Sequence, residues 1–385
     1  MRTYKKDWQE ENVYEASVRR IEKLYDLFDT IVVSFSGGKD STVALNIALE
    51  VAKKRNRLPL IVYSIDEEAI HPETVEYMER VAANPDIDFR WYCIPVEHRN
   101  ACSRKQLYWY PWNPEKKDLW VRPLPEGAIT ELPEEWMYYK PFPEIAPFLF
   151  PADEYGSVAD VRGLRADESL RRYQAVASKL EDNWIAKPRN GNNSPTSPIY
   201  DWTSFDIWMA MKTFGWDYSR AYDKMTMFGM PLVQQRVCPP FGEEPLRNLR
   251  MYKVCWPEMW DKMVNRVHGA NTAVQYCDTQ LYSFGKVTCP PGLTFKEWTF
   301  KLLELYPPEN RDLIKKNILK MIKMHKNKTN RPIHDSEPDE YTGISWKYIA
   351  MIANRGDTKG RRAGKAAANT KTTVSNEDLD SGTRY

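Results

Sequence analysis

The sequence lacks a long hydrophobic run: no apolar stretch approaches the roughly 18 consecutive residues that a membrane-spanning helix needs. Its first residues, MRTYKKD, also lack the apolar segment of a secretion signal. We therefore expect no membrane contact and a cytoplasmic location. Net charge is small as well, because 55 basic side chains face 53 acidic ones. The chain as a whole thus lacks the positive surplus typical of nucleic-acid-binding proteins.

Closely spaced cysteines are missing too. The chain has six, all far apart: Cys93, Cys102, Cys238, Cys255, Cys277 and Cys289. Without a C-C or C-x-x-C pair, the sequence predicts neither a zinc site nor an iron–sulfur cluster, and buried free thiols are the expected state. Cys102 follows the third predicted strand, where an open parallel sheet binds ligands. It is interpreted either as a reactive thiol beside an arginine or as an ordinary loop cysteine.

The most informative segment present is 31–41, IVVSFSGGKDS, a β-branched strand that runs into a Gly-Gly turn. Apolar residues recur at helical spacing after it, at Val43, Ile47 and Val51, which places the turn at a helix N-terminus. Unpaired N–H groups, the helix dipole and Lys39 predict an anion site there. A Gly-Gly turn alone also occurs as a plain connection between a strand and a helix. The serines, the lysine and the aspartate favour a binding site for nucleotide phosphate. The G-x-x-x-x-G-K-[ST] pattern is absent, so γ-phosphate hydrolysis is not predicted.

Two further segments point to the same site. Asp66 ends a second apolar run, 60–65, where a carboxylate binds a ribose hydroxyl or magnesium, or simply forms a turn. Segment 161–169, VRGLRADES, carries Arg162 and Arg165, which either contact phosphate or pair with surface carboxylates. The adjoining glycine favours the phosphate interpretation.

Segment 198–208, PIYDWTSFDIW, has a structural interpretation. Thr203 and Asp206 are expected to cap a helix, and Trp202 and Trp208 to anchor the core. An amphipathic helix is expected over residues 8–28, and its inward-facing residues are Val18, Ile21, Leu24 and Leu27.

Three strands and two helices alternate over 31–94, and the pattern resumes near 158. This order predicts an α/β fold: a Rossmann-like parallel sheet with helices on both faces, followed by a mostly helical C-terminal domain. The predicted divisions are a nucleotide-binding domain over 1–230, a helical domain over 231–354 and a disordered basic tail over 355–385.

A stretch rich in proline and aromatic residues, 97–157, interrupts the first domain. It either forms a lid or partner surface or packs irregularly onto the domain. Residues 235–242 are expected to form a structured loop from which Arg236 reaches the site. The tail is either a solvated terminus or a weak contact for nucleic-acid phosphates.

Residues Ser36–Ser41 resemble the S-G-G-x-D-S loop of the PP-loop ATP pyrophosphatases, in the adenine nucleotide α-hydrolase-like (HUP-type) superfamily. In that superfamily the loop holds the pyrophosphate that leaves when ATP is cleaved between its α and β phosphates. Segment 66–74 resembles the D-x-x-x-x-x-P-E-T element of its phosphoadenosine phosphosulfate reductase branch. Segments 161–169 and 198–208 are similar to that branch's G-[IL]-R-x-x-x-S and P-[IL]-x-D-W-[ST]-x-x-D-[IV]-W elements.

The chain departs from the sulfonucleotide reductases, because its phosphate loop is complete and a C-G-x-H segment is missing. With its added helical domain it resembles phage and mobile-element proteins of the immunoglobulin-binding regulator A type, whose members often accompany a ParB-like protein. The resemblance implies sulfur metabolism or nucleotide transfer and a possible ParB-like partner.

For function, the resemblance implies three alternatives. The first is an enzyme that uses ATP and magnesium to adenylate an acceptor and releases pyrophosphate. The second is a sulfonucleotide reductase or sulfurtransferase using Cys102 or Cys238. The third is a regulatory subunit that senses nucleotide by binding ATP without turnover and acts with a ParB-like DNA-binding partner.

The site residues implied for the first alternative fall into three groups. Lys39, Asp40 and Arg165 are the catalytic candidates. Asp40 and Asp66 are the candidate magnesium ligands. The nucleotide would contact Ser34, Ser36, Gly37, Gly38, Lys39, Asp40, Ser41, Asp66, Arg162, Gly163 and Arg165.

Overall fold

The structure is a computed structural model that describes residues 9–177, 182–188, 191–238, 240–242, 245–276 and 288–360. The chain divides into two compact units. The first unit comprises Met1–His98, Tyr110–Pro240 and Met251–Arg266, and the second comprises Arg99–Trp109, Phe241–Arg250 and Val267–Tyr385. Across the described ranges, no helix combines the length and the apolar character needed to cross a bilayer.

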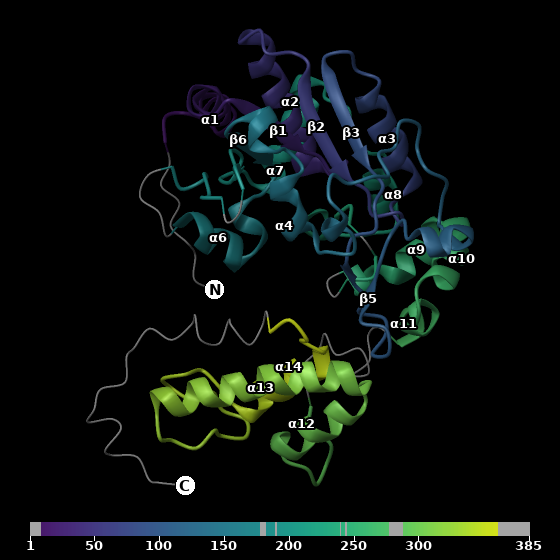
Figure 1. The fold of residues 1–385 in the computed structure, drawn as a ribbon, viewed down its shortest axis with the longest axis vertical. Helices are drawn as coiled ribbons and strands as arrows, with labels where there is room; N and C mark the ends of the chain where they lie inside the picture. Colours follow the sequence, from purple (N-terminus) through teal and green to yellow (C-terminus); the bar gives the residue numbers. More distant parts are fainter. Residues whose placement is uncertain are drawn as a thin grey trace. The chain divides into compact units, whose positions relative to one another are not determined.

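The first unit is built on a parallel sheet whose described strands have the order β3-β2-β1-β6-β7 (Figure 1). The strands are β1 (Thr30–Ser34), β2 (Leu60–Ile65), β3 (Ile87–Tyr92), β6 (Val158–Arg162) and β7 (Asn193–Thr196). β1 pairs in parallel with both β2 and β6, so the strand order reverses at β1. This is the predicted Rossmann-like, HUP-type sheet, and ligands of such sheets bind outside the carboxyl ends of the strands at the reversal.

Helices cover one face of this sheet. They are α1 (Val13–Leu27), α2 (Lys39–Lys54), α3 (Pro72–Ala82) and α7 (Ser204–Phe214). Their apolar side chains share one core with alternate strand residues such as Val33 and Val161. The predicted cap of α7 is confirmed: Thr203 accepts the Asp206 N–H, and the Asp206 carboxylate accepts the Thr203 N–H.

Helix α1 packs as expected over most of its length. Ile21 and Leu24 are fully buried, but Leu27 is 52% exposed, because the helix ends there and the chain turns away into β1. Trp202 is buried as a core anchor, since its indole N–H donates to the Val13 carbonyl and the Ser17 hydroxyl. Trp208 is partly buried against the same core.

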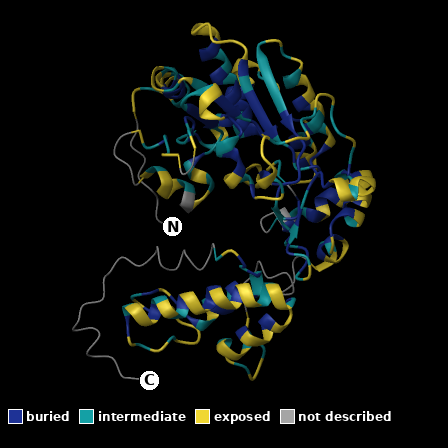
Figure 2. Cartoon of the chain, viewed as in Figure 1, coloured by how far each residue is buried: buried dark blue, intermediate teal, exposed yellow. Residues whose placement is uncertain are grey.

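The other face of the sheet is covered by the later part of the segment rich in proline and aromatic residues, whereas Trp112, from its earlier part, lies in the first core. The short helices of this segment are η1 (Pro114–Leu119), η2 (Glu135–Met137), α4 (Phe142–Ile145), η3 (Ala146–Phe148) and α5 (Ala152–Tyr155). Ile145 and Phe150 pack against Val32 and Tyr63 in a second core. Figure 2 shows the central strands largely in the dark blue of buried residues, whereas the edge strand β3 is mostly teal, because four of its six residues are only partly buried. Of the two interpretations of this segment, packing onto the domain is the one observed over 137–150.

The helical C-terminal region predicted from the sequence is confirmed. In the second unit α12 (Phe295–Glu304), α13 (Pro308–Lys328) and α14 (Trp346–Arg355) bury residues such as Leu302, Ile318 and Ile349 around a core of their own. A two-stranded sheet joins β4 (His98–Arg99) to β5 (Tyr108–Trp109). The remaining helices are η4 (Ala166–Glu168), α6 (Leu170–Ala177), α8 (Ala221–Met227), η5 (Leu232–Gln234), η6 (Pro245–Asn248), α9 (Leu249–Cys255), α10 (Pro257–Arg266) and α11 (Ala270–Tyr276).

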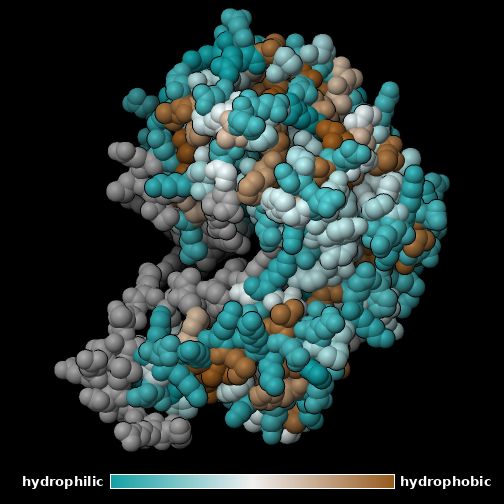
Figure 3. All heavy atoms as spheres, in the orientation of Figure 1, coloured by the Kyte–Doolittle hydropathy of each residue, from teal (hydrophilic) through white to brown (hydrophobic). Residues whose placement is uncertain are grey.

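The start of the predicted tail belongs to the second unit. Asn317 on α13 donates hydrogen bonds to the carbonyls of Asp357 and Thr358. Residues 361–385, which carry most of the predicted basic tail, lie outside the described residues. The face drawn in Figure 3 is mostly hydrophilic, with apolar residues in scattered patches.

Candidate functional site

The Gly-Gly turn joins β1 directly to α2, as the sequence predicts. Gly38 is the N-cap of α2, and as a glycine it supplies no side-chain cap to this helix end. Gly37 has φ +68, and a Cβ there would lie 2.6 Å from the Thr74 methyl carbon, so only glycine fits. The turn therefore brings the backbone to the start of a helix, where anions bind.

Hydroxyl groups close the loop on itself. The Ser36 and Ser41 hydroxyl oxygens lie 3.2 Å apart, and the Ser41 hydroxyl donates to the Gly38 carbonyl at 2.9 Å. The Lys39 N–H, at the first position of α2, donates to the hydroxyl of Tyr222 on α8 at 2.9 Å. Tyr222 thus binds the helix end that a phosphate would occupy.

Two buried cations flank the carboxylate of Asp40. Lys39 is 4% exposed, and its Nζ lies 3.1 Å from Asp40 Oδ2. Arg165 is 3% exposed, and its Nε lies 2.6 Å from Asp40 Oδ1. Burial lowers the pKa of Lys39 below its usual value, while Asp40 opposes the shift. The structure thus brings together the loop and the Arg-Gly-Leu-Arg segment, 125 residues apart.

Arg165 is further surrounded by acceptors. Its Nη1 lies 2.5 Å from Asp167 Oδ1, and its Nη2 donates to the Ser204 hydroxyl at 3.2 Å. Glu168 lies 3.7 Å from the same guanidinium and also pairs with Arg172. The guanidinium is therefore held in one orientation beside the loop.

Gly163 contributes by its lack of a side chain. A Cβ at this position would lie 2.5 Å from the Ser41 nitrogen and 2.6 Å from the Asp40 carbonyl carbon. The end of β6 therefore packs directly on the first turn of α2. This contact explains why glycine stands between Arg162 and the next arginine.

Ser34 and Arg162, also predicted to bind nucleotide, lie in a different cluster. They are register partners on β1 and β6, on the sheet face covered by the 97–157 segment. Ser34 hydrogen-bonds the Tyr63 hydroxyl, which donates to Asp160 Oδ2 at 3.1 Å. Arg162 binds the same oxygen through Nε at 2.8 Å and Nη2 at 2.5 Å. Strand alternation points the side chains of Ser34 and Arg162 away from Lys39. Their contact with nucleotide stays a prediction.

Asp66 also has an arrangement different from the expected one. Its carboxylate is fully buried and accepts hydrogen bonds from the Trp91 and Trp112 indoles, at 2.8 and 3.0 Å, and from the Glu68 N–H. Arg122 forms an ion pair with it. A ribose or magnesium role for Asp66 stays a prediction, and it would require Arg122 to move aside.

The cysteines and acidic residues that the structure describes are candidate metal ligands by their chemistry. Among the described residues, no three His, Cys, Asp or Glu side chains gather as ligands. Cys93 and Cys102 are buried thiols outside any disulfide, as expected, whereas Cys238, Cys255 and Cys289 are half-buried; Cys277 lies outside the described residues. Burial of Cys102 favours the interpretation as an ordinary loop cysteine.

Sequence patterns missed Tyr222 and Gln235, the latter a carbonyl acceptor for Lys39 Nζ at 3.2 Å. Tyr222 lies in a short amphipathic helix, where an aromatic residue has the pattern of any core residue, so no local signal marks it.

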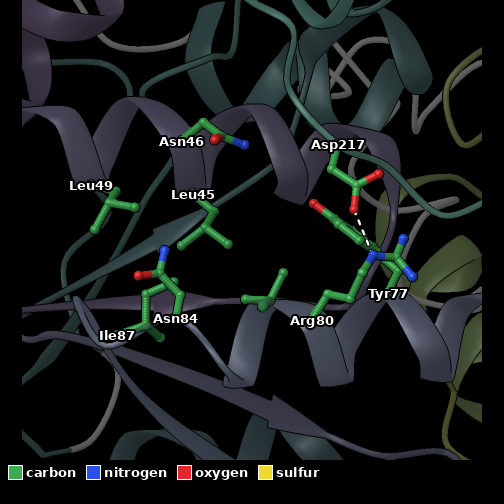
Figure 4. Close-up of a pocket in the computed structure, with 9 residues that line it drawn as sticks. Leu45, Asn46, Leu49, Tyr77, Arg80, Asn84, Ile87 and Asp217 are labelled. Carbon is green, nitrogen blue, oxygen red and sulfur yellow. Dashed lines mark hydrogen bonds and ion pairs between the residues drawn. The ribbon is translucent and has the colours of Figure 1, made fainter.

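A small surface pocket lies elsewhere in the first unit (Figure 4). It is lined by Leu45, Asn46, Leu49, Tyr77, Arg80, Val81, Asn84, Ile87 and Asp217. Arg80 closes one side through an ion pair with Asp217 at 2.8 Å. The pocket contains none of the predicted site residues.

His71, the N-cap of α3, is a buried titratable group in the first unit. Its ring stacks on Tyr252 at 4.9 Å and packs against Trp256 at 4.4 Å. Within the described part of the chain, neither ring nitrogen has a hydrogen-bond partner. Burial lowers the pKa of His71 from 6.5 to about 4; Glu73 opposes this shift and Lys224 adds to it.

We expect His71 to make the first unit less stable in acid. Between pH 6.5 and about 4 the unfolded chain protonates this ring and the folded chain does not, so stability falls as pH falls. The loss between pH 7 and 5 should be about 2 kcal/mol. Urea unfolding at pH 7 and pH 5 measures the difference in the free energy of unfolding. In His71→Phe, which lacks the titrating ring, this difference should be smaller by the contribution of His71. Equal losses in both proteins would contradict the prediction.

The sheet order, the loop between β1 and α2 and the arginine after β6 define a PP-loop α/β domain. The model of the phosphoadenosine phosphosulfate reductase domain matches residues 30–227, and a domain of unknown function, DUF3440, matches residues 229–333. The chain therefore belongs to the phosphoadenosine phosphosulfate reductase domain family.

Its relatives include the uncharacterized protein YbdN of Escherichia coli strain K12. The two are 31% identical over 316 residues, which cover 78% of this chain and 77% of that protein. Among solved structures, the phosphoadenylyl-sulfate reductase of Candida auris is 14% identical with a TM-score of 0.30, covering 57% of this chain and 93% of that one. The FMN adenylyltransferase of Candida glabrata is 12% identical with a TM-score of 0.33, covering 56% and 62%.

Proposed function

We propose that the chain binds ATP at the loop and cleaves it between the α and β phosphates, adenylating an acceptor. A nucleophilic atom of the acceptor forms a bond to the α phosphorus. The bond from that phosphorus to the bridging oxygen breaks, and its electron pair leaves with pyrophosphate. The observation that supports the proposal best is the buried Lys39–Asp40–Arg165 chain at the N-terminus of α2.

In this proposal each loop group has a task. Ser36, Gly37, Gly38 and Ser41 surround the leaving pyrophosphate with backbone N–H groups and hydroxyls. Lys39 and Arg165 offset the charge that develops as it leaves, and burial makes that interaction stronger than in water. Asp40 holds both cations in place. Their orientation before the reaction is what lowers the barrier.

Magnesium fits this arrangement as an ion bound mainly by the phosphates. Magnesium sites at nucleotides typically use one or two carboxylates together with phosphate oxygens. Of the two predicted magnesium ligands, Asp40 is the one that lies in the phosphate loop. It would exchange its contact with Lys39 or Arg165 for a contact with the metal. The metal would supply further charge compensation.

A second candidate is sulfonucleotide reduction through Cys238. The supporting observation is its place: the Cys238 carbonyl accepts from Tyr252, and the preceding residue, Val237, donates its N–H to the Tyr222 hydroxyl beside Lys39. This candidate needs a thiol that attacks sulfur, whereas ATP cleavage needs none.

The test is incubation with magnesium and α-labelled ATP, followed by separation of AMP, ADP and adenylated products. We expect AMP or an adenylated product, lowered about 100-fold in Lys39→Ala because one charge-stabilising donor is lost. Lys53→Ala is the matched control, since Lys53 is exposed on the same helix and pairs with Asp86.

The other outcomes are equally informative. Binding of ATP without cleavage would favour the sensing function, and no binding would refute the site assignment. A Cys238→Ser variant should keep ATP cleavage. Sulfite release from phosphoadenosine phosphosulfate in the presence of a dithiol reductant, lost in this variant, would favour the reductase: the thiol would take the sulfo group, and the dithiol would release it as sulfite and become a disulfide.

A further inference from the structure

The segment 235–238 lies directly against the phosphate loop. The Gln235 carbonyl accepts from Lys39 Nζ at 3.2 Å. Its side chain is buried and donates to the Thr226 hydroxyl and the Met230 carbonyl, each at 2.9 Å. Gln235 is therefore a fixed backbone contact of the loop lysine.

Both neighbours of Arg236 are attached to the same place. Val237 donates its N–H to the Tyr222 hydroxyl, which also accepts the Lys39 N–H. One residue further on, the Cys238 carbonyl accepts from the Tyr252 hydroxyl at 3.2 Å. The backbone that carries Arg236 is thus held at the N-terminus of α2 from both sides.

The side chain of Arg236 adds a third cation there. The residue is exposed, unlike Lys39 and Arg165. After burial and the opposing effect of Asp40, the charges of Arg165 and Arg236 further lower the pKa of Lys39, which places the three cations within interaction range.

The loop cations are largely compensated by protein carboxylates already. Asp40 pairs with both Lys39 and Arg165, and Asp167 pairs with Arg165 as well. A triphosphate brings several negative charges to this point, so its outer phosphates require positive charge beyond the buried pair. Arg236 is exposed and follows Gln235, whose carbonyl binds Lys39, so its charge is accessible to phosphates that extend from the loop.

We propose that Arg236 binds the outer phosphates of the nucleotide, so that the region matched as a domain of unknown function supplies part of the phosphate site. The inference rests on the proposed nucleotide site and adds selectivity to it: a nucleoside triphosphate gains more from Arg236 than a monophosphate does. Arg236 is a binding residue in this proposal, and the chemistry stays with the buried cations.

The test is the affinity of Arg236→Gln for α,β-methylene ATP and for AMP, measured by calorimetry on the full chain. We expect the dissociation constant to rise about tenfold for the triphosphate, the loss of one charge-assisted hydrogen bond. For AMP the change should stay below about threefold, because the outer phosphates are missing. Arg236→Lys should recover part of the triphosphate affinity, since it keeps the charge.

Arg220→Gln is the matched control, an exposed arginine at the start of α8 that pairs with Asp217 and should leave both affinities unchanged. Equal affinities of Arg236→Gln and the unmodified protein, with binding lost in Lys39→Ala, would overturn this inference and leave the proposed site intact. Equal losses for ATP and AMP would also overturn it. Failure of the unmodified protein to bind any nucleotide would overturn the proposed function itself.

Discussion

A Gly163→Ala variant is expected to lose about 100-fold in turnover of ATP, because displacement of reacting groups by about 1 Å costs that much. The added Cβ would lie 2.5 Å from the Ser41 nitrogen and 2.6 Å from the Asp40 carbonyl carbon. These are backbone atoms in the first turn of α2 and cannot rotate away. The turn must shift, and the side chains of Lys39 and Asp40 shift with it. Labelled-ATP turnover and nucleotide affinity measure the effect.

Gly127→Ala is the control for this variant. Gly127 has φ +71, so alanine there is strained by about 1 kcal/mol, yet a Cβ would meet open space. We expect a lower melting temperature with unchanged turnover. If Gly163→Ala kept full activity, the close packing of β6 on the loop would have no functional role.

Arg266→Met is expected to destabilise the first unit by about 3–5 kcal/mol, since it leaves a buried carboxylate unpaired. Glu68 and Arg266 have side chains 0% and 2% exposed and form two hydrogen bonds of 2.8 and 3.0 Å. Glu68 also accepts the backbone N–H groups of Trp112 and Val121, so the pair joins the loop after β2 to the 97–157 segment and to α10.

The double variant Glu68→Gln with Arg266→Met should recover part of that loss. Glutamine removes the unpaired charge but keeps an acceptor for only one of the two backbone N–H groups, which donate to different oxygens of Glu68. Urea unfolding followed by tryptophan fluorescence measures Glu68→Gln, Arg266→Met and the double variant in one cycle. Arg80→Met, which breaks the exposed pair with Asp217, should cost less than about 1 kcal/mol. A similar small cost for Arg266→Met would show that the buried pair does not stabilise the unit.

Several features of the site could be predicted because they are local. The strand, the Gly-Gly turn and the helix that follows are specified within 31–51 by β-branched residues, glycine and helical spacing. The cap of α7 likewise depends on residues three apart. The link between Arg165 and the loop was anticipated only through the resemblance of its segment to a family element, since no local pattern joins residues 125 positions apart.

What the pattern could not predict depends on which face a residue occupies and on what packs there. The sequence predicts that Ser34 and Arg162 contact the nucleotide, and the structure places them on the sheet face with Tyr63 and Asp160. Asp66 was correctly placed at the end of a strand. Its partners Trp112 and Arg122 come from a segment without helical or strand periodicity, so their contact with it had no sequence signal.

By itself, the sequence determined the parallel α/β sheet, the phosphate loop and the helical C-terminal region, because each depends on patterns repeated over short stretches of chain. The tertiary structure alone reveals the Lys39–Asp40–Arg165 chain and the contacts of Tyr222 and Gln235 with Lys39. It also reveals that Arg122 forms an ion pair with Asp66. The physical reason is that these are interactions between buried charges and polar groups from distant segments. Their geometry is set by how the segments pack, and packing couples the whole unit rather than neighbours in sequence.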